Sequence, residues 1–260
     1  MAEDPKQKTT KEFKFPTEII DLPSRGKIYP EDSPLRSGQV ELKYMTTREE
    51  DILTSQNLIK KGVVIDRLLE SLIVTKGVRC ENLILGDKNA VMVAARILAY
   101  GPEYKCKVMH PDTGAEIEHT FNLTECPFIE LPDSIDVSKG NLFSFKLPAS
   151  KNEVEFKLLT GADEKMITSD IKSNKKMGRE DSEMSSRIKQ AIVSIDGETD
   201  RPTISNYVDN MLARDSLALR REIASLTPDI EMKQEIEVGG EMVEVIVPLT
   251  IEFFWPKASR

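Results

Sequence analysis

Cysteine and histidine are scarce in this sequence of 260 residues, which contains three cysteines and two histidines. The cysteines, Cys80, Cys106 and Cys126, are odd in number and lack paired spacing, so the sequence predicts no disulfide framework and a reducing, cytoplasmic compartment. With only His110 and His119 available, a nucleophile, base and acid would all have to meet in one short segment. Neither a GxxxxGKS or GxxxxGKT phosphate loop nor GxGxxG is present. We therefore expect no enzymatic activity.

Long apolar runs are also missing. No stretch approaches the roughly 18 residues needed to span a bilayer, and the opening MAEDPKQKTTKEF has no apolar signal core, so we expect neither secretion nor membrane insertion. Lys and Arg number 36 against 44 Asp and Glu, and the net charge of −8 disfavours nucleic acid and anionic membranes as partners. The hydrophobic content of 39% is that of an ordinary globular protein.

An internal repeat is the main positive feature. Residues 40–55 read VELKYMTTREEDILTS and residues 154–169 read VEFKLLTGADEKMITS, with seven of sixteen positions identical at an offset of 114. In both copies an alternating segment runs into a threonine, Thr46 or Thr160, that acidic residues follow within four positions. A hydroxyl before acidic residues is the signature of a helix N-cap. Each copy therefore predicts a strand, a cap and a helix.

Later segments of the two copies also correspond. Apolar residues at helical spacing occupy residues 68–73 and again residues 188–195, and further helices are predicted over 87–98 and 215–226. Each copy then closes on a predicted β-hairpin, with turns at residues 111–114 and at Gly239–Gly240. The polar run 170–186 predicts a loop or an exposed helix extension.

These patterns predict an α+β fold of two diverged repeats, each a short strand, a helical segment and a β-hairpin. The predicted organisation is an extended N-terminal arm (1–39), repeat unit 1 (40–126), a linker (127–141) and repeat unit 2 with an aromatic C-terminus (142–260). Acidic pairs at the start of the first predicted helices, such as Glu49 and Glu50, are interpreted as complementing the helix dipole rather than as a catalytic dyad.

Four residues of zinc-ligand type fall within 21 positions: Cys106, His110, His119 and Cys126. Cys106 and His110 lie four residues apart on a predicted strand, which separates them by roughly 13 Å, too far for one ion. If the turn centres on Asp112 and Thr113, Cys106 lies opposite His119, so two ligands can meet but not four. We expect no metal and no cofactor. A zinc-ribbon-like nucleic-acid-binding protein remains the alternative.

Two segments are candidates for partner binding. Phe253, Phe254 and Trp255 are adjacent on a predicted strand, where alternation turns at least one ring outward; the alternative is packing against the last helix. The predicted arm carries Arg25, Lys27 and Tyr29 in a stretch without helical or strict strand period. It either packs along its own domain or lies across a neighbour.

Taken together, several segments resemble one known family. They are LPSRGKIYP, VELKYMTTREEDILTS with LIKKG and DRLLESL, GDKNAVMVAARILAYGPEY, HTFNL and the terminal FFWP. In this order, over nearly the whole chain, they resemble the baseplate hub subunits of T-even-like contractile-tailed bacteriophages. The resemblance implies zinc-ribbon-like CxxC pairs in the hairpins, but this sequence keeps only Cys106 near the first position and nothing in the second hairpin. This departure argues against metal binding, in agreement with the distance between Cys106 and His110.

The resemblance implies a role in building the central hub of the tail baseplate, from which the tail tube grows. The implied partners are other baseplate hub and tail proteins, and the implied locations are the host cytoplasm during assembly and the baseplate of the virion. Two roles stay open at this point: a structural component of the particle, or an assembly chaperone absent from the mature virion.

Overall fold

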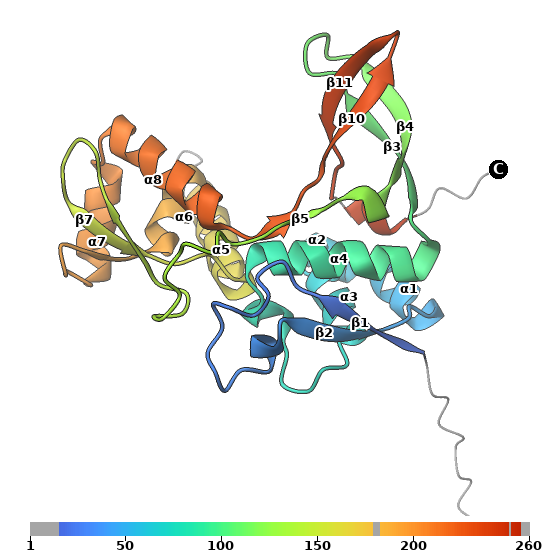
Figure 1. Ribbon diagram of the computed structural model, residues 1–260, viewed down its shortest axis with the longest axis horizontal. Helices are drawn as coiled ribbons and strands as arrows, with labels where there is room; N and C mark the ends of the chain where they lie inside the picture. The colour runs from blue at the N-terminus through green and yellow to red at the C-terminus, as the bar shows by residue number, and fades with distance from the viewer. Residues whose placement is uncertain (1–15, 179–182, 250, 256–260) are drawn as a thin grey trace, which may run out of the picture.

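The computed structural model describes residues 16–178, 183–249 and 251–255. Within these ranges the chain has eight α-helices and five small antiparallel sheets, which confirms the predicted α+β class. Figure 1 shows three parts: a first lobe containing β1, β2 and α1–α4, a second lobe containing β6–β8 and α5–α8, and a hairpin projection made of β3, β4, β10 and β11. None of the described helices is long and apolar enough to cross a bilayer.

The first lobe begins with strand β1 (Thr17–Asp21), which pairs antiparallel with β2 (Gln39–Lys43). The described part of the predicted arm is thus built into this lobe's sheet, while residues 1–15 lie outside the described residues. Four helices follow and surround a core of fully buried leucines: α1 (Thr47–Thr54), α2 (Gln56–Lys61), α3 (Val64–Leu72) and α4 (Leu85–Tyr100).

The second lobe also opens with two strands, contains four helices and has one additional strand. It comprises β6 (Phe143–Lys146), β7 (Glu153–Phe156), α5 (Gly161–Lys176), α6 (Glu183–Ala191), β8 (Ile192–Ile195), α7 (Arg201–Asp209) and α8 (Ala213–Leu226). The predicted helical stretch 188–195 is wrong in its second half, because the β-branched run from Ile192 pairs with β7 as a third strand. The exposed helix extension is observed as the end of α5, and residues 179–182 are not described.

A buried carboxylate ties together the elements of the first lobe. Glu49, the third residue of α1, is fully buried and closes a capping box with Thr46. Its Oε1 accepts hydrogen bonds from Lys43 Nζ at 2.8 Å and Ser71 Oγ at 2.7 Å. Burial alone would raise the pKa of Glu49, but the bonds from Lys43, Ser71 and Thr46 outweigh it and lower the pKa to about 2. One carboxylate therefore joins β2, α1 and α3.

The second lobe repeats this network at the predicted offset. Asp163 closes a capping box with Thr160 and accepts hydrogen bonds from Lys157 Nζ at 2.6 Å and Gln190 Nε2 at 2.7 Å. Burial opposes ionisation here too, and the bonds from Lys157 and Gln190 still lower the pKa of Asp163. Because Gln190 belongs to α6, α6 takes the position in this network that α3 takes in the first lobe.

A second pair of buried aspartates corresponds in the same way. Asp87 near the start of α4 accepts from the backbone N–H of Ser24 at 3.0 Å, in the loop that links β1 and β2. Asp215 near the start of α8 accepts from the N–H groups of Ala149 and Ser150 at 2.7 and 2.9 Å, in the loop that links β6 and β7. Thus α8 takes the position of α4.

The two lobes meet at the start of α4. Leu85 N–H donates to Leu159 O at 3.0 Å, Gly161 N–H donates to Leu83 O at 2.9 Å, and the carbonyl of Pro228 lies against Gly86. Nearby, β5 (Phe128–Ile129) in the predicted linker pairs with β9 (Asp229–Ile230), which precedes the second hairpin in the sequence.

The hairpin projection consists of β3 (Glu103–Met109) paired with β4 (Glu116–Asn122), and β10 (Lys233–Val238) paired with β11 (Glu241–Ile246). Cys106 lies opposite His119, as the predicted turn required, and the second turn falls at Gly239–Gly240 as predicted. Strands β3 and β11 are in contact, and the two hairpins stand side by side above the lobes (Figure 1).

Candidate interaction surfaces

Tyr29, a candidate from the predicted arm, is used inside the chain. Its hydroxyl donates to Asp87 Oδ2 at 2.6 Å and accepts from Ile84 N–H at 3.0 Å, and the ring is buried. Burial raises the pKa of both groups, and the neighbouring Asp87 raises that of Tyr29 further. In the described chain Tyr29 therefore fastens the arm to the start of α4.

The two basic candidates of the arm form ion pairs within the chain. Arg25 contacts Asp21 at 3.0 Å and Glu130 at 2.9 Å, and Lys27 contacts Asp133 at 2.9 Å. All of these side chains are more than one third exposed, so solvent screens the pairs and they add little to stability. The pairs hold the loop after β1 beside residues 130–133.

The aromatic C-terminus differs from the predicted strand. Phe253 and Phe254 lie in a single 3-10 turn (Ile251–Phe254) with no exposed surface, because the Phe253 ring packs edge-on against Tyr104 at 4.9 Å and its carbonyl accepts from Arg96 Nε at 2.9 Å. Strand alternation does not apply to a 3-10 turn. Of the three rings, only Trp255 reaches the surface, with 40% of its area exposed.

The four residues of zinc-ligand type make different contacts and do not converge on one point. Cys106 is buried, and His119 across the ladder stacks edge-on against Phe121 at 4.7 Å. His110 accepts from backbone N–H groups of the turn, and Cys126 Sγ accepts from Gln234 Nε2 at 3.1 Å. Burial raises the pKa of the Cys126 thiol, which disfavours the thiolate that zinc needs. No group of three or more metal-ligating side chains occurs among the described residues.

We expect metal analysis of the purified chain to find less than about 0.1 zinc per molecule, and chelator treatment to leave the thermal midpoint unchanged within about 1 °C, because a structural zinc contributes directly to folding. Inductively coupled plasma mass spectrometry and a thermal melt with and without EDTA make the measurement. Stoichiometric zinc that chelator removes together with folding would restore the zinc-ribbon alternative.

The negative charge of the molecule is concentrated around the hairpin projection. Residues 103–122 contain four acidic and two basic residues, and residues 233–246 contain four acidic and one basic, whereas the net charge of the whole chain is −8. The three lysines of the hairpins, Lys105, Lys107 and Lys233, all pair with glutamates on the same hairpin. The projection is therefore acidic and carries more than half of the net negative charge of the chain.

Exposed apolar side chains lie on the same projection. Met242 and Ile246 on the outward face of β11 are each 63% exposed, and Met109 at the end of β3 is 59% exposed. The inward residues Val243 and Val245 are buried. Apolar groups flanked by carboxylates on a protruding element are typical of a surface that meets another protein.

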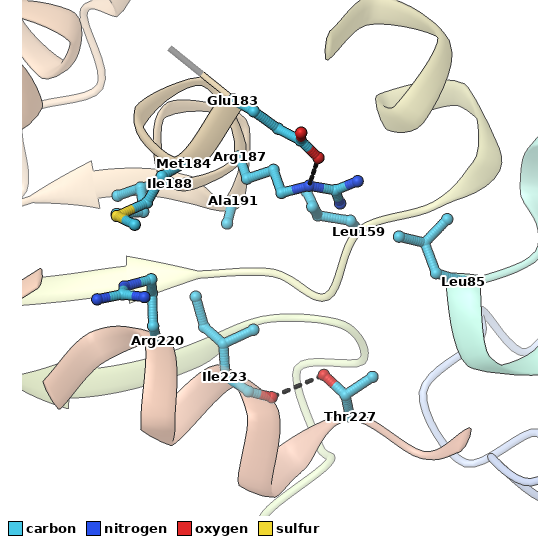
Figure 2. Close-up of a pocket in the computed structure, with 10 residues that line it drawn as sticks. All are labelled: Leu85, Leu159, Glu183, Met184, Arg187, Ile188, Ala191, Arg220, Ile223 and Thr227. Carbon is cyan, nitrogen blue, oxygen red and sulfur yellow. Dashed lines mark hydrogen bonds and ion pairs between the residues drawn. The ribbon is translucent and has the colours of Figure 1, made fainter. Parts of the chain in front are cut away.

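A groove of about 560 Å³ crosses the second lobe. Figure 2 shows side chains of α6 and of α8 pointing toward one another across it. Six of the lining residues are apolar: Leu85, Leu159, Met184, Ile188, Ala191 and Ile223. Its volume lies in the range of ligand pockets, but Met184 is 55% exposed, so the space is an open groove rather than an enclosed cavity.

The polar side chains that line this groove form hydrogen bonds or ion pairs within the chain, with one exception. Arg187 pairs with Glu183 at 3.2 Å and with Glu164 at 2.9 Å, and the Thr227 hydroxyl donates to Ile223 O at 2.6 Å (Figure 2). Arg220 is exposed and has no hydrogen bond or ion pair within the described ranges.

Comparison with known proteins gives one finding. A family model described as T4 bacteriophage base plate protein matches residues 9–247, which is most of the chain. No curated protein sequence gives a significant match, and neither does any solved structure.

Proposed function

The chain belongs to the T4 bacteriophage base plate protein family, and we propose that it acts in the tail baseplate as a hub component or hub-assembly factor that binds other tail proteins without catalysing a reaction. The family supports a structural or assembly role in the baseplate. The observation that carries the finer proposal is the hairpin projection, whose acidic and exposed apolar residues stand clear of both lobes (Figure 1).

Of the other candidate contact residues, only Trp255 keeps a largely exposed side chain that the rest of the described chain does not use, and it is less exposed than Met242 and Ile246. Tyr29, Phe253 and Phe254 are buried, and Arg25 and Lys27 pair within the chain. An assembly protein needs exposed apolar side chains that do not pack within its own fold. Met242 and Ile246 are such side chains. Its complement is a partner surface with basic residues around an apolar patch.

We expect the double variant Met242→Glu, Ile246→Glu to reduce co-purification with the phage's other hub and tape-measure proteins at least about tenfold, because two charges would be buried against the apolar patch of the partner. The measurement is co-expression followed by affinity purification. The matched control is Ile19→Glu, Met177→Glu, since these residues are 65% and 66% exposed and lie outside the projection.

Two results would overturn the proposal: no co-purification of the native chain with any of these proteins, or normal tail assembly after deletion of its gene. Mass spectrometry of purified tails then separates the two roles. A component is retained in the mature particle at a fixed copy number, whereas an assembly chaperone is found only in intermediates.

A further inference from the structure

The two lobes also differ in how one pair of corresponding helices packs. In the first lobe α3 and α4 pack directly against each other, whereas α6 and α8, which take their places in the second lobe, are not a closely packed pair. The correspondence follows from the contacts to buried carboxylates: Ser71 and Gln190 for α3 and α6, Asp87 and Asp215 for α4 and α8. The groove of Figure 2 is the space that this difference leaves open.

We propose that this groove is a docking site for an amphipathic α-helix of another tail protein, whose apolar side chains fill the space between α6 and α8 and whose carboxylate pairs with Arg220. The partner's class, a tail protein, rests on the proposed function. The groove and its chemistry do not.

The chemistry of the walls selects a helix. The lining consists of apolar side chains and three charged ones besides Thr227, and the strand beneath the groove, β7, already pairs with β6 on one side and β8 on the other. An extended segment would bring backbone N–H and C=O groups that nothing in the groove can satisfy. A helix satisfies its own backbone and presents residues at i, i+3, i+4 and i+7, the usual mode of recognition by an apolar groove between helices.

The charge of the groove selects an acidic residue on that helix. Arg187 is already neutralised by Glu183 and Glu164, which leaves Arg220 as the lining cation with no carboxylate among the described residues. The chain's own terminal segments fit poorly as occupants, because residues 1–15 carry four lysines against three acidic residues and residues 256–260 carry Lys257 and Arg260. A carboxylate from elsewhere complements Arg220.

The first experiment places a photo-reactive benzoylphenylalanine at Met184, inside the groove, or at Leu217, which is 41% exposed on α8 but does not line it. Cross-linking is carried out on full-length chain in cells assembling tails, and cross-linked peptides are sequenced. We expect position 184, and not 217, to capture one segment of another tail protein with apolar residues at helical spacing and an acidic residue beside them. A cross-link to a second copy of the chain, to a segment without that pattern, or to nothing would overturn the proposal.

The second experiment tests the charge with a synthetic peptide of the captured segment. We expect Arg220→Glu to weaken its binding at least about tenfold, Arg220→Lys to retain most of it, and replacement of the peptide's acidic residue by lysine to restore binding to the Arg220→Glu chain. The control is Arg221→Glu, an exposed neighbour that does not line the groove. Equal binding by the Arg220→Glu and Arg221→Glu chains would overturn the ion pair. Retained co-purification through the hairpins in these variants shows that the proposed function stands separately.

Discussion

Replacing Gly86 with alanine will lower the free energy of unfolding by about 3 kcal/mol or more. A Cβ at this position would lie 1.7 Å from the carbonyl oxygen of Pro228 and 2.7 Å from its carbon. Overpacking costs about 1–3 kcal/mol where side chains can move aside, and here the obstacle is the backbone of Pro228 and Asp229. Because Asn89 also holds Asp229 from the same helix at 3.1 Å, any displacement of Pro228 strains that bond as well.

The control for Gly86→Ala is Gly178→Ala. At Gly178 alanine is unfavourable because of the backbone conformation, whereas at Gly86 it is unfavourable because of a steric clash. Gly178 has φ of +69°, and no atom of the described residues lies within 4 Å of the place a Cβ would take, so alanine there meets a backbone cost of about 1 kcal/mol. Gly86 has helical backbone inside α4, where alanine alone would be favourable by about 0.5–1 kcal/mol. Urea unfolding measures both. A Gly86→Ala chain within about 1 kcal/mol of the native one would show that the start of α4 and residue 228 are not held in contact.

Local signals were sufficient to predict the parts of the fold that depend on neighbouring residues. The threonine caps at Thr46 and Thr160 and the ladder opposite Cys106 follow from residues a few positions apart, and the structure has them where the sequence placed them. The strand from Ile192 could not be predicted in this way, since it pairs with β7, in which Val154 lies opposite Ile195 and about 40 residues earlier. Phe253 is buried by Tyr104 and Arg96, which are even more distant in sequence.

The same distinction between local and distant contacts applies to the interaction surfaces. The alternation around Gly239–Gly240 carried enough information to place Met242 and Ile246 outward once Val243 and Val245 were taken as the inner face. The predicted contacts were instead the aromatic residues Phe253, Phe254 and Trp255, of which only Trp255 is exposed. No local sequence pattern could predict the groove, because it forms where α6, α8 and Leu85 come together in space.

The buried carboxylate of Glu49 gives the second large effect. We expect Glu49→Gln to lower the free energy of unfolding at pH 7 by about 3 kcal/mol, because the ionised group accepts bonds from Lys43 and Ser71 and is fully buried. Lowering the pKa from its ordinary value of 4.5 to about 2 corresponds to a stabilisation on the order of 3 kcal/mol. The control is Asp51→Asn, an exposed acidic residue of the same helix.

The sign of the pH dependence follows from the lowered pKa. Above about pH 4.5 the unfolded chain ionises Glu49 as readily as the folded one, so the whole stabilisation is present; as pH falls toward 2 the unfolded state takes up the proton first, and the stabilisation disappears. Urea unfolding of the native and Glu49→Gln chains at pH 7, 5.5, 4.5 and 3.5 should therefore give curves that stay parallel down to about pH 5 and then converge. A difference that stays constant through pH 3.5 would show that the Glu49→Gln chain is destabilised through packing alone, and that the ion pair with Lys43 contributes nothing to joining β2, α1 and α3.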